Sequence, residues 1–354
     1  MEKMVDLSFY KGKKVLLTGH TGFKGSWMTR ILLNAGAEVT GFSLPAPTDP
    51  SLFDIADVEP HINSITGDVR ELDKLMDAFR QSGAEIVFHM AAQPIVRESY
   101  SAPVYTYETN VMGTVNFLEC VRLTSGIKSV INITTDKVYL NREWNWGYRE
   151  NEELCGFDPY SNSKSCSELV TYSYVNSFFN SDASPAVSTA RSGNVIGGGD
   201  FAADRIIPDC VRAAMSGGRM TVRNAHSTRP YQHVLECLSG YLLLAQAQYE
   251  NRGLMGNYNF GPDDSSCVDT ARLVDLFCSK WGEGFGWDNK SDNGPHEANF
   301  LKLDCSKSKA ILNWHPHWSI ETAVESVVDF TKIYRDGGSI PQIMDKQIAS
   351  YFSK

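Results

Sequence analysis

Residues 129–139 have the sequence SVINITTDKVY, in which positions 130–133 are apolar apart from one asparagine. A short β-branched run bounded by polar residues predicts a buried strand. Open parallel sheets bind their ligands at the carboxyl ends of the strands. The residues after the run, Thr135, Asp136 and Lys137, are therefore predicted at the mouth of a cleft.

Residues 160–164 have the sequence YSNSK, so Tyr160 and Lys164 are four positions apart. On the helix predicted over about 161–179, the two side chains share one face. A neighbouring cation favours the phenolate of a tyrosine, whose free pKa is about 10. A base that works near neutrality needs a shift of about 3 pKa units, or roughly 4 kcal/mol. We expect Lys164 to supply part of this shift and a bound cationic cofactor to add to it.

A glycine-rich loop lies near the start of the chain. A strand predicted over 14–18 leads into GHTGFKG at 19–25 and a helix over 26–34. This order is that of a dinucleotide site, in which the glycines allow a tight turn, backbone approach to a pyrophosphate, and close helix packing. The helix N-terminus then faces the phosphates. The spacing is G-x-x-G-x-x-G, and its position favours a cofactor loop over a structural turn. The candidate cofactor residues are Gly19, Thr21, Gly22, Phe23 and Gly25.

The residues alone leave the choice between NAD and NADP open. A second predicted strand, 38–42, is followed by Ser43, where an NAD site usually has an acid. No arginine there marks a 2′-phosphate. After a third predicted strand, Asp68 is placed either to accept a hydrogen bond from adenine or to cap the next helix. Both interpretations stay open, and Asp68 and Val69 are candidate cofactor residues.

A fourth predicted strand, 86–90, ends in small residues that would let a cofactor lie against the backbone. Ala91, Ala92 and Gln93 are therefore candidates, whereas His89 inside the strand is interpreted as a core residue.

Asn110 lies in the middle of a helix predicted over about 103–123. It either belongs to a polar helix face or orders backbone or water beside the cofactor site.

Alternating strands and helices with short connections predict a doubly wound, Rossmann-type parallel sheet. A sixth strand is predicted over 185–191, after which the pattern changes. Later helices are predicted over about 234–249, 268–281 and 320–334.

A chain of 354 residues usually has more than one core, so we expect a smaller mixed α/β substrate lobe. The expected dinucleotide-binding domain is 1–191, to which 231–260 returns. The expected substrate lobe is 192–230 together with 261–354.

Basic and glycine-rich segments follow the last predicted Rossmann strand. Such loops are commonly solvated turns, but arginines and an asparagine in this place suit a diphosphate ligand. Arg229 is the strongest candidate. The full set of substrate-binding candidates is Asn194, Arg191, Arg205, Arg223 and Arg229.

The composition argues against several other classes of protein. The net charge of −9 disfavours nucleic-acid and anionic-membrane partners. No apolar run is long enough to span a bilayer. The eight cysteines form no CxxC pair, so neither a metal site nor a disulfide framework is predicted. A reducing cytoplasm is the expected location.

These motifs together resemble the extended short-chain dehydrogenase/reductase family over nearly the whole chain. The matching residues are Gly19, Gly22, Gly25, Asp68, Ala91, Ala92, Asn110, Tyr160 and Lys164. Nucleotide-sugar 4,6-dehydratases of this family carry Thr-Asp-Glu where this chain has Thr135-Asp136-Lys137. The sequences TGHTGFKGSW at 18–27 and STRPYQH at 227–233 are similar to the branch that acts on CDP-D-glucose.

The resemblance implies tightly bound NAD and conversion of CDP-D-glucose into CDP-4-dehydro-6-deoxy-D-glucose and water, within deoxysugar and O-antigen biosynthesis. It implies that Tyr160 removes the O4 proton while Thr135 hydrogen bonds the same oxygen. Lys137 would take the C5 proton, and Asp136, held protonated, would protonate the departing O6. Adjacent strand residues point to opposite faces, so Asp136 and Lys137 can both face the sugar only if the strand has already ended.

Three other functions stay open. A nucleotide-sugar 4-epimerase would need Tyr160 and Lys164 but no acid–base pair at Asp136 and Lys137. A non-catalytic dinucleotide sensor or a structural subunit would not need the tyrosine and lysine.

We also expect a homodimer. The helices over 103–123 and 161–179 carry more apolar and aromatic residues than one core-facing stripe needs, and their outer faces would pair into a four-helix bundle. Examples are Tyr172, Tyr174, Phe178 and Phe179.

Overall fold

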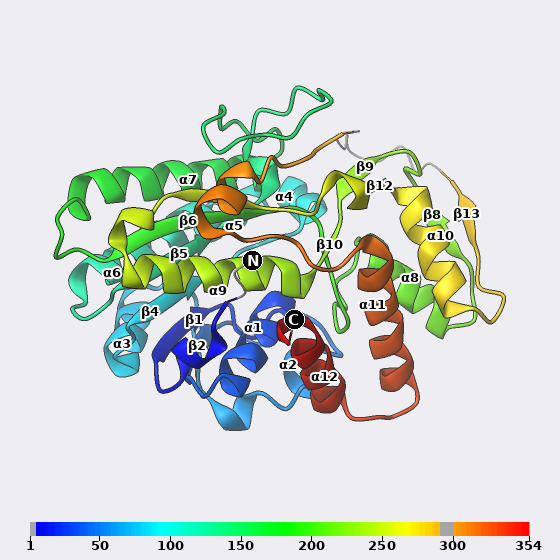
Figure 1. Cartoon of the computed structure of the whole chain (residues 1–354), viewed down its shortest axis with the longest axis horizontal. Coiled ribbons are helices and arrows are strands. Elements are labelled where there is room, and N and C mark those ends of the chain that lie inside the picture. The colour runs from blue at the N-terminus through cyan, green and yellow to red at the C-terminus, as the bar shows by residue number, and fades with distance from the viewer. Residues whose placement is uncertain (1–4, 291–299, 354) are drawn as a thin grey trace.

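Seven strands form the central sheet of the computed structural model, which describes residues 5–290 and 300–353 (Figure 1). Their order is β11-β6-β5-β4-β1-β2-β3, and every pairing is parallel. The predicted doubly wound fold is confirmed, and its ligand crevice is expected at the carboxyl ends of the neighbouring strands β1 and β4, where the strand order reverses. The strands are β1 (Lys14–Thr18), β2 (Glu38–Ser43), β3 (Asn63–Thr66), β4 (Ile86–His89), β5 (Ser129–Ile133), β6 (Ala186–Ser192) and β11 (Asn257–Phe260).

Helices cover both faces of the sheet. On one face lie α1 (Phe23–Asn34) and α9 (Val234–Glu250), and on the other α3 (Leu72–Ser82), α6 (Gly113–Leu123) and α7 (Pro159–Phe178). Successive strand residues point to opposite faces. Val15 and Leu17 accordingly join the core under α1 and α9, whereas Leu16 joins the core under α3 and α6. Both faces of β5 are buried, and its two polar residues, Ser129 and Asn132, make hydrogen bonds there.

The helix predicted over 103–123 has an irregular centre. It consists of α5 (Pro103–Tyr107), the π-helical turn η3 (Glu108–Met112) and α6. A π turn is a local widening of a helix that occurs frequently at functional sites. Here it carries Asn110, so the irregular turn lies at a predicted site residue.

Sequence reasoning placed the later helices correctly but missed others. The predicted helices over 268–281 and 320–334 are α10 (Thr270–Trp281) and α11 (Ile320–Arg335). The unpredicted helices are α2 (Leu52–Ile55), α4 (Val96–Ser101), α8 (Ile206–Met215) and α12 (Ile340–Phe352). The remaining short helical turns are η1 (Leu7–Tyr10), η2 (Glu59–His61), η4 (Asp136–Val138), η5 (Arg252–Leu254), η6 (Asp264–Ser266) and the π-helical η7 (Ser308–Leu312).

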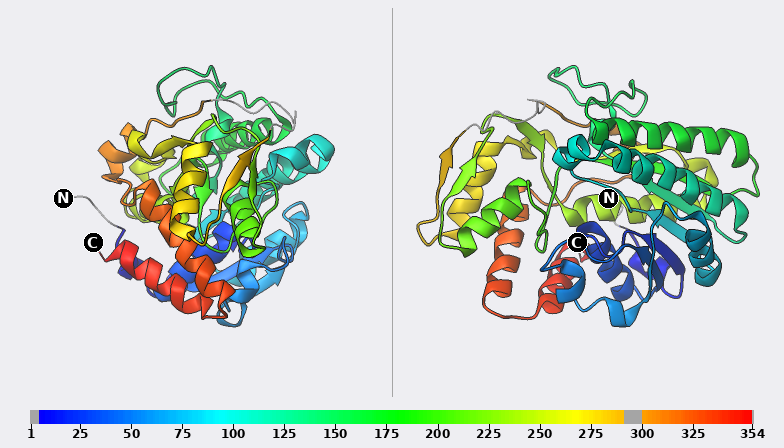
Figure 2. Two further views of the ribbon diagram at one scale, coloured as in Figure 1. Left: turned by 90° about the vertical axis from the view of Figure 1, so that its right-hand side faces the viewer. Right: turned by 180° about the vertical axis from the view of Figure 1, so that it is seen from behind.

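A second core lies between α8, α10 and α11, beside the central sheet (Figure 2). Short two-stranded pairings complete this region. Their strands are β7 (Val195–Ile196), β8 (Met220–Val222), β9 (Thr228–Pro230), β10 (Gln232–His233), β12 (Cys267–Asp269) and β13 (Trp287–Asn289).

Two segments that follow the first residues of the second core in the sequence pack against the Rossmann part. Within 231–260, α9 packs on β5 and β6, and β11 pairs with β6. The last helix, α12, packs on α1 although it belongs to the segment expected in the substrate lobe. Tyr351 of α12 donates a 2.7 Å hydrogen bond to Glu236 of α9. Residues 1–4, 291–299 and 354 of the predicted domains lie outside the described residues.

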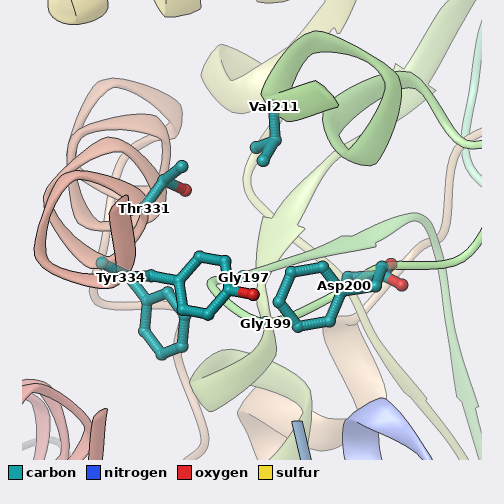
Figure 3. Close-up of a pocket in the computed structure, with 8 residues that line it drawn as sticks. Gly197, Gly199, Asp200, Val211, Thr331 and Tyr334 are labelled. Carbon is teal, nitrogen blue, oxygen red and sulfur yellow. The ribbon is translucent and has the colours of Figure 1, made fainter. Parts of the chain in front are cut away.

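The glycine-rich loop after β6 packs closely against α11 (Figure 3). A Cβ at Gly198 would overlap the Phe330 side chain, and the Trp27 indole donates a 3.0 Å hydrogen bond to the Gly198 carbonyl. The cavity left between this loop, α8 and α11 measures about 10 Å³, which is roughly the space of one water molecule. The loop therefore joins the second core to α1 and leaves no room there for a ligand.

Within the described residues, no helix combines the length and the apolar character that crossing a membrane requires.

Candidate active site

Thr135, Asp136 and Lys137 follow the carboxyl end of β5. The strand ends at Ile133, and Asp136 begins the 3₁₀ turn η4. Thr135 caps this turn, because its hydroxyl oxygen accepts a 3.4 Å hydrogen bond from the Lys137 backbone N–H. The strand alternation has thus ended before Asp136, and the geometric condition for Asp136 and Lys137 to face one ligand is met.

The Asp136 carboxyl group is almost fully enclosed, with a relative exposure of 1%. Its Oδ1 accepts a 3.0 Å hydrogen bond from the Thr135 hydroxyl, whereas its Oδ2 has no partner among the described residues. Burial raises the pKa of this carboxyl, and the nearby cations Lys137, Arg229 and Lys24 only partly offset the rise. The protein therefore favours the protonated form of this carboxyl more than water does, and one of its buried oxygens has no partner among the described residues.

Tyr160 and Lys164 lie on the first turns of α7. Asp158 caps this helix by accepting a 2.9 Å hydrogen bond from the Ser161 N–H. The Lys164 ammonium donates a 3.1 Å hydrogen bond to the Ile133 carbonyl and so joins α7 to the end of β5. Burial and the charge of Lys24 lower the pKa of Lys164 to about 8.

The phenol of Tyr160 is not activated in the ligand-free protein. Burial raises the pKa of Tyr160 to about 12, against the opposing effect of a hydrogen bond with Thr135. The shift is opposite in direction to the one that a base requires, so the expected contribution of a bound cationic cofactor becomes a necessity.

The glycine loop has the geometry that a dinucleotide needs. Gly19 has a φ of +77°, and a Cβ there would lie 2.7 Å from the Ala91 backbone nitrogen. A Cβ at Gly25 would overlap the Gly19 carbonyl oxygen. Gly22 caps α1 with an extended backbone, so α1 begins at Phe23, three residues earlier than predicted. The loop therefore presents the helix N-terminus beside the small residue Ala91.

The position that usually holds an acid is occupied by a hydroxyl pair. Thr21 Oγ1 lies 2.9 Å from Ser43 Oγ and donates a 2.9 Å hydrogen bond to the Leu44 carbonyl.

Asp68 does not cap α3. Its carboxylate accepts a hydrogen bond from the Arg70 N–H at 2.9 Å and forms a 2.7 Å ion pair with the Arg70 guanidinium. The helix-cap interpretation is thus wrong, because Glu71 occupies the N-cap position. The adjacent Val69 side chain is buried against Gly113.

Asn110 orders the segment that follows β4. Its Oδ1 accepts a 2.9 Å hydrogen bond from the Gln93 N–H, and its amide donates to the Gln93 carbonyl at 3.0 Å and to the Ser163 hydroxyl at 2.9 Å. This buried asparagine therefore connects the loop of Ala91, Ala92 and Gln93 to α7. His89 is a core residue as expected, since it is buried and stacks on Phe117.

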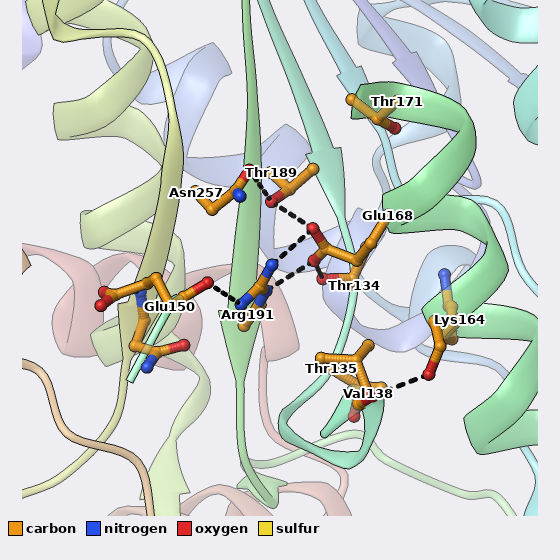
Figure 4. Close-up of polar contacts among 12 residues, drawn as sticks. Thr134, Thr135, Val138, Glu150, Lys164, Glu168, Thr171, Thr189, Arg191 and Asn257 are labelled. Atoms are coloured by element: carbon orange, nitrogen blue, oxygen red, sulfur yellow. Dashed lines mark hydrogen bonds and ion pairs between the residues drawn. The ribbon is translucent and has the colours of Figure 1, made fainter. Parts of the chain in front are cut away.

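Arg191 does not bind a diphosphate, contrary to the prediction. Its side chain has no exposed surface and forms a two-pronged ion pair of 2.8 Å with Glu168 of α7 (Figure 4). Its remaining donors reach the Tyr139 hydroxyl and the Glu150 carbonyl. All the guanidinium contacts are internal, so Arg191 connects β6 to α7 instead of facing a ligand.

The other substrate candidates lie on separate segments. Arg229 on β9 is buried, with a relative exposure of 6%, and its charge acts on Asp136. Arg205, at the start of α8, pairs with Asp200 at 2.9 Å and acts on Tyr160. Arg223 is paired with Asp204 at 3.3 Å, and the Asn194 carbonyl accepts a 3.0 Å hydrogen bond from Gln232. Arg229 and Arg205 therefore lie within electrostatic range of the catalytic candidates.

Sequence reasoning missed Lys24 of the glycine loop. Its ammonium donates a 3.2 Å hydrogen bond to the Ser192 hydroxyl at the end of β6. The available signal was a charged side chain between two glycines of a loop that approaches phosphates, but nothing local shows that this chain reaches β6.

Comparisons with known proteins show what this chain is similar to. The profile of the family described as GDP-mannose 4,6 dehydratase matches residues 16–327. The chain is 47% identical to a CDP-glucose 4,6-dehydratase of Salmonella typhimurium, over 99% of both chains. The fold is similar to a dTDP-glucose 4,6-dehydratase from Bacillus anthracis in complex with NAD, with a TM-score of 0.75, 20% identity, and coverage of 92% of this chain and 99% of that one. It is equally similar to a UDP-glucose 4-epimerase of Thermus thermophilus in complex with NAD, with a TM-score of 0.77, 22% identity, and coverage of 90% and 98%.

Proposed function

The chain belongs to the family described as GDP-mannose 4,6 dehydratase, and from this membership we propose that it converts CDP-D-glucose into CDP-4-dehydro-6-deoxy-D-glucose and water. The observation that carries the proposal is the enclosed Asp136 carboxyl beside Thr135, with one oxygen lacking a partner among the described residues. An epimerase that inverts C4 has no step for such an acid. The choice of the cytidine nucleotide rests on the similarity to the Salmonella typhimurium protein, which extends over 99% of this chain.

We infer that NAD is the cofactor. The backbone of Gly19, Gly22 and Phe23 would hold its pyrophosphate at the start of α1. Asp68, Val69 and the loop of Ala91, Ala92 and Gln93 would border the adenosine half. Thr21 and Gly25 complete the glycine-rich turn. Asn110 hydrogen bonds to Gln93 and so holds the loop that follows β4. Arg70, the arginine near this end, is already neutralised by Asp68 and Glu108, which disfavours a 2′-phosphate.

Each catalytic side chain can then carry out its own step of the reaction. A bound NAD would supply the hydride chemistry, namely oxidation at C4 and reduction at C6 by the same hydride. Tyr160 accepts the O4 proton while Thr135 hydrogen bonds that oxygen. Lys137 accepts the C5 proton, which the new 4-ketone has made acidic. Asp136 donates its proton to the C6 hydroxyl, which leaves as water, and a proton returned to C5 completes the product.

The second core would hold the nucleotide. We propose that Arg229 binds the substrate diphosphate, with Arg205, Arg223 and Asn194 near it, because Arg229 is buried beside the catalytic turn. In this division, residues 192–230 and 261–339 form the substrate lobe, and α12 belongs with α1.

Isotope labelling tests the proposed reaction. We expect CDP-D-glucose deuterated at C4 to give a 4-keto-6-deoxy product that carries the deuterium at C6, because the same cofactor molecule removes and returns the hydrogen. The product is followed by mass and by the ultraviolet absorbance of the keto sugar in alkali, with UDP-, dTDP- and GDP-glucose as comparison substrates. Deuterium in released NADH would indicate a simple dehydrogenase. A C4-inverted sugar that keeps all its oxygens would indicate an epimerase.

We propose that the protein is a homodimer joined by α5–α6 and α7, which lie side by side on the outside of the molecule (Figure 2, right). Large apolar side chains on this face are exposed, among them Val104 (69%), Leu169 (53%) and Tyr172 (68%). Exposed apolar patches of this kind mark interaction surfaces. Phe178 also lies on the outer face, but Phe179 is buried in the core and Tyr174 is partly buried, so these two do not contribute as expected.

Charge placed on this face should separate the subunits. We expect the wild-type protein to sediment at twice its chain mass of 39.4 kDa, and Leu169→Glu/Tyr172→Glu to sediment at that mass. Ile333→Glu, on exposed surface of α11, is the matched control and should leave the dimer intact. A wild-type protein that sediments as a single chain at micromolar concentration would refute the proposed dimer.

We also propose a location in the cytoplasm and a role in deoxysugar biosynthesis. All eight cysteines are free thiols, as a reducing compartment would keep them.

A further inference from the structure

Lys24 carries a positive charge from the cofactor loop to the catalytic end of the sheet. It is the second residue of α1, and its ammonium donates hydrogen bonds to the Ser192 hydroxyl at 3.2 Å and the Tyr241 hydroxyl at 3.5 Å. Those two hydroxyls are themselves 2.6 Å apart, and the ammonium lies 5.7 Å from the centre of the Tyr241 ring. Two partners on different elements therefore hold the side chain in one place.

This position faces the catalytic residues. Ser192 ends β6 and is followed by Gly193, where a Cβ would lie 3.1 Å from the unpartnered Oδ2 of Asp136. Lys164 is hydrogen bonded to the carboxyl end of β5, the neighbouring parallel strand. Neighbouring strands are about 4.8 Å apart, so the two ammonium groups lie on adjacent strand ends at the same edge of the sheet.

No carboxylate neutralises Lys24 within the described part of the chain, where its hydrogen bonds go to hydroxyls. The other buried cation nearby, Arg191, is fully paired with Glu168. A partly buried charge held by neutral groups is free to act on its surroundings, because its field is not cancelled locally.

Building on the proposed function, we propose that Lys24 is a positioning residue for proton transfer: its fixed ammonium repels the proton of Lys164, so that Lys164 can release this proton near neutral pH. The low pKa of Lys164, about 8, agrees with this role, since Lys24 is the main charge that opposes its protonation. The charge of Lys24 also lowers the pKa of Asp136. Removing the cation should therefore raise the pKa of Lys164 and the pKa of Asp136.

Other charges act on the same groups, and a test must leave them in place. Glu168 opposes the effect of Lys24 on Lys164, and Arg229 and Lys137 act on Asp136. The titratable and charged groups that face this region are Lys24, His89, Asp136, Lys137, Asp158, Tyr160, Glu168, Arg191, Arg205, Arg229, Cys237 and Tyr241.

Lysine titration in the ligand-free protein tests the proposal directly. In protein with ¹³C-labelled lysine, the Lys164 resonance, assigned with Lys164→Arg, is followed by NMR against pH. Lys24→Met removes the charge at nearly constant length and should raise the pKa of Lys164 by roughly one unit. Lys24→Arg should keep it near the wild-type value, and Ser192→Ala, which removes one of the two hydrogen-bond partners of the ammonium, should give an intermediate shift. Lys74→Met, on the surface of α3, is the control and should change nothing.

The pH profile of the dehydration gives the second readout. In Lys24→Met, both the acidic and the basic limb of the pH profile of kcat/KM should shift to higher pH by a similar amount. In Lys24→Arg, both limbs should return to their wild-type positions. An unchanged Lys164 titration in folded Lys24→Met would overturn the proposal. So would an equal loss of NAD⁺ and NADH affinity without any pH shift, because Lys24 would then be a phosphate ligand. A shifted Lys164 titration in a protein that does not dehydrate CDP-D-glucose would support the role of Lys24 and refute the proposed function.

Discussion

Lys137→Met is expected to lower turnover by roughly 10²–10⁴-fold, the usual contribution of a general base. Lys137 lies in η4 directly after Asp136, and its side chain makes no hydrogen bond or ion pair among the described residues. A base that takes the C5 proton acts only after C4 has been oxidised. The variant should therefore carry out the Tyr160-dependent oxidation and stop, and the absorbance of reduced nicotinamide should build up on the enzyme in a single turnover.

Asp136→Asn provides the matched comparison. Its amide cannot donate the proton that O6 needs to leave as water, but Lys137 is still present. This variant should exchange the C5 proton for deuterium in heavy water while forming no dehydrated product. In the wild-type enzyme, the product should carry one solvent deuteron at C5. Near-normal turnover of Lys137→Met would show that another group, such as a bound water, removes the C5 proton.

Glu168→Gln is expected to reduce the free energy of unfolding by about 3–5 kcal/mol, because it leaves the buried Arg191 charge without its partner. Domains of ordinary stability unfold at a cost of about 5–15 kcal/mol, so the loss is a large fraction of the total. Thr134 and Thr189 also donate hydrogen bonds to the Glu168 carboxylate. The same change should lower activity, since this ion pair connects β6 to the helix that carries Tyr160 and Lys164.

Urea unfolding of three variants separates the contribution of the Glu168–Arg191 ion pair from that of side-chain packing. Arg191→Met should cost a similar amount to Glu168→Gln, because it leaves the carboxylate unpaired. The double variant Glu168→Met/Arg191→Met should recover part of the loss, since no isolated buried charge remains. Additive losses in the double variant would mean that the two residues act independently.

The Glu168 pair should also make stability depend on pH. Burial alone would raise the pKa of Glu168, but Arg191 and the two threonines outweigh it and hold the pKa below its usual value. The stabilisation by Glu168 is therefore complete above the unfolded pKa of about 4.3, and it is lost as the pH falls through the lower folded value. The difference in stability between the wild type and the double variant should shrink over that acidic range.

Most of the fold could be predicted because its determinants are local. The strands and helices of the Rossmann part follow from hydrophobic period and turn residues, which are properties of short segments. The helices α4 and α12 were missed because neither carries one of the site motifs. The π turn in the 103–123 helix was missed because periodicity over such a length resembles an unbroken helix. The loop of residues 192–200 has the glycine content of a ligand loop. Its Gly198 instead packs against Phe330 and accepts a hydrogen bond from Trp27, and both residues come from elsewhere in the chain.

The sequence by itself determined six of the seven strands of the sheet, the glycine loop, the pairing of Tyr160 with Lys164 on one helix face, and the order Thr135-Asp136-Lys137 after a strand. Each of these depends on residues within a few positions of one another. Only the tertiary structure decided that Arg191 pairs with Glu168, that Asp136 is enclosed enough to favour its protonated form, and that Lys24 reaches Ser192, which lies 168 positions away. Charge and protonation inside a protein depend on desolvation and on partners brought together by folding, and neither quantity is a property of a local segment.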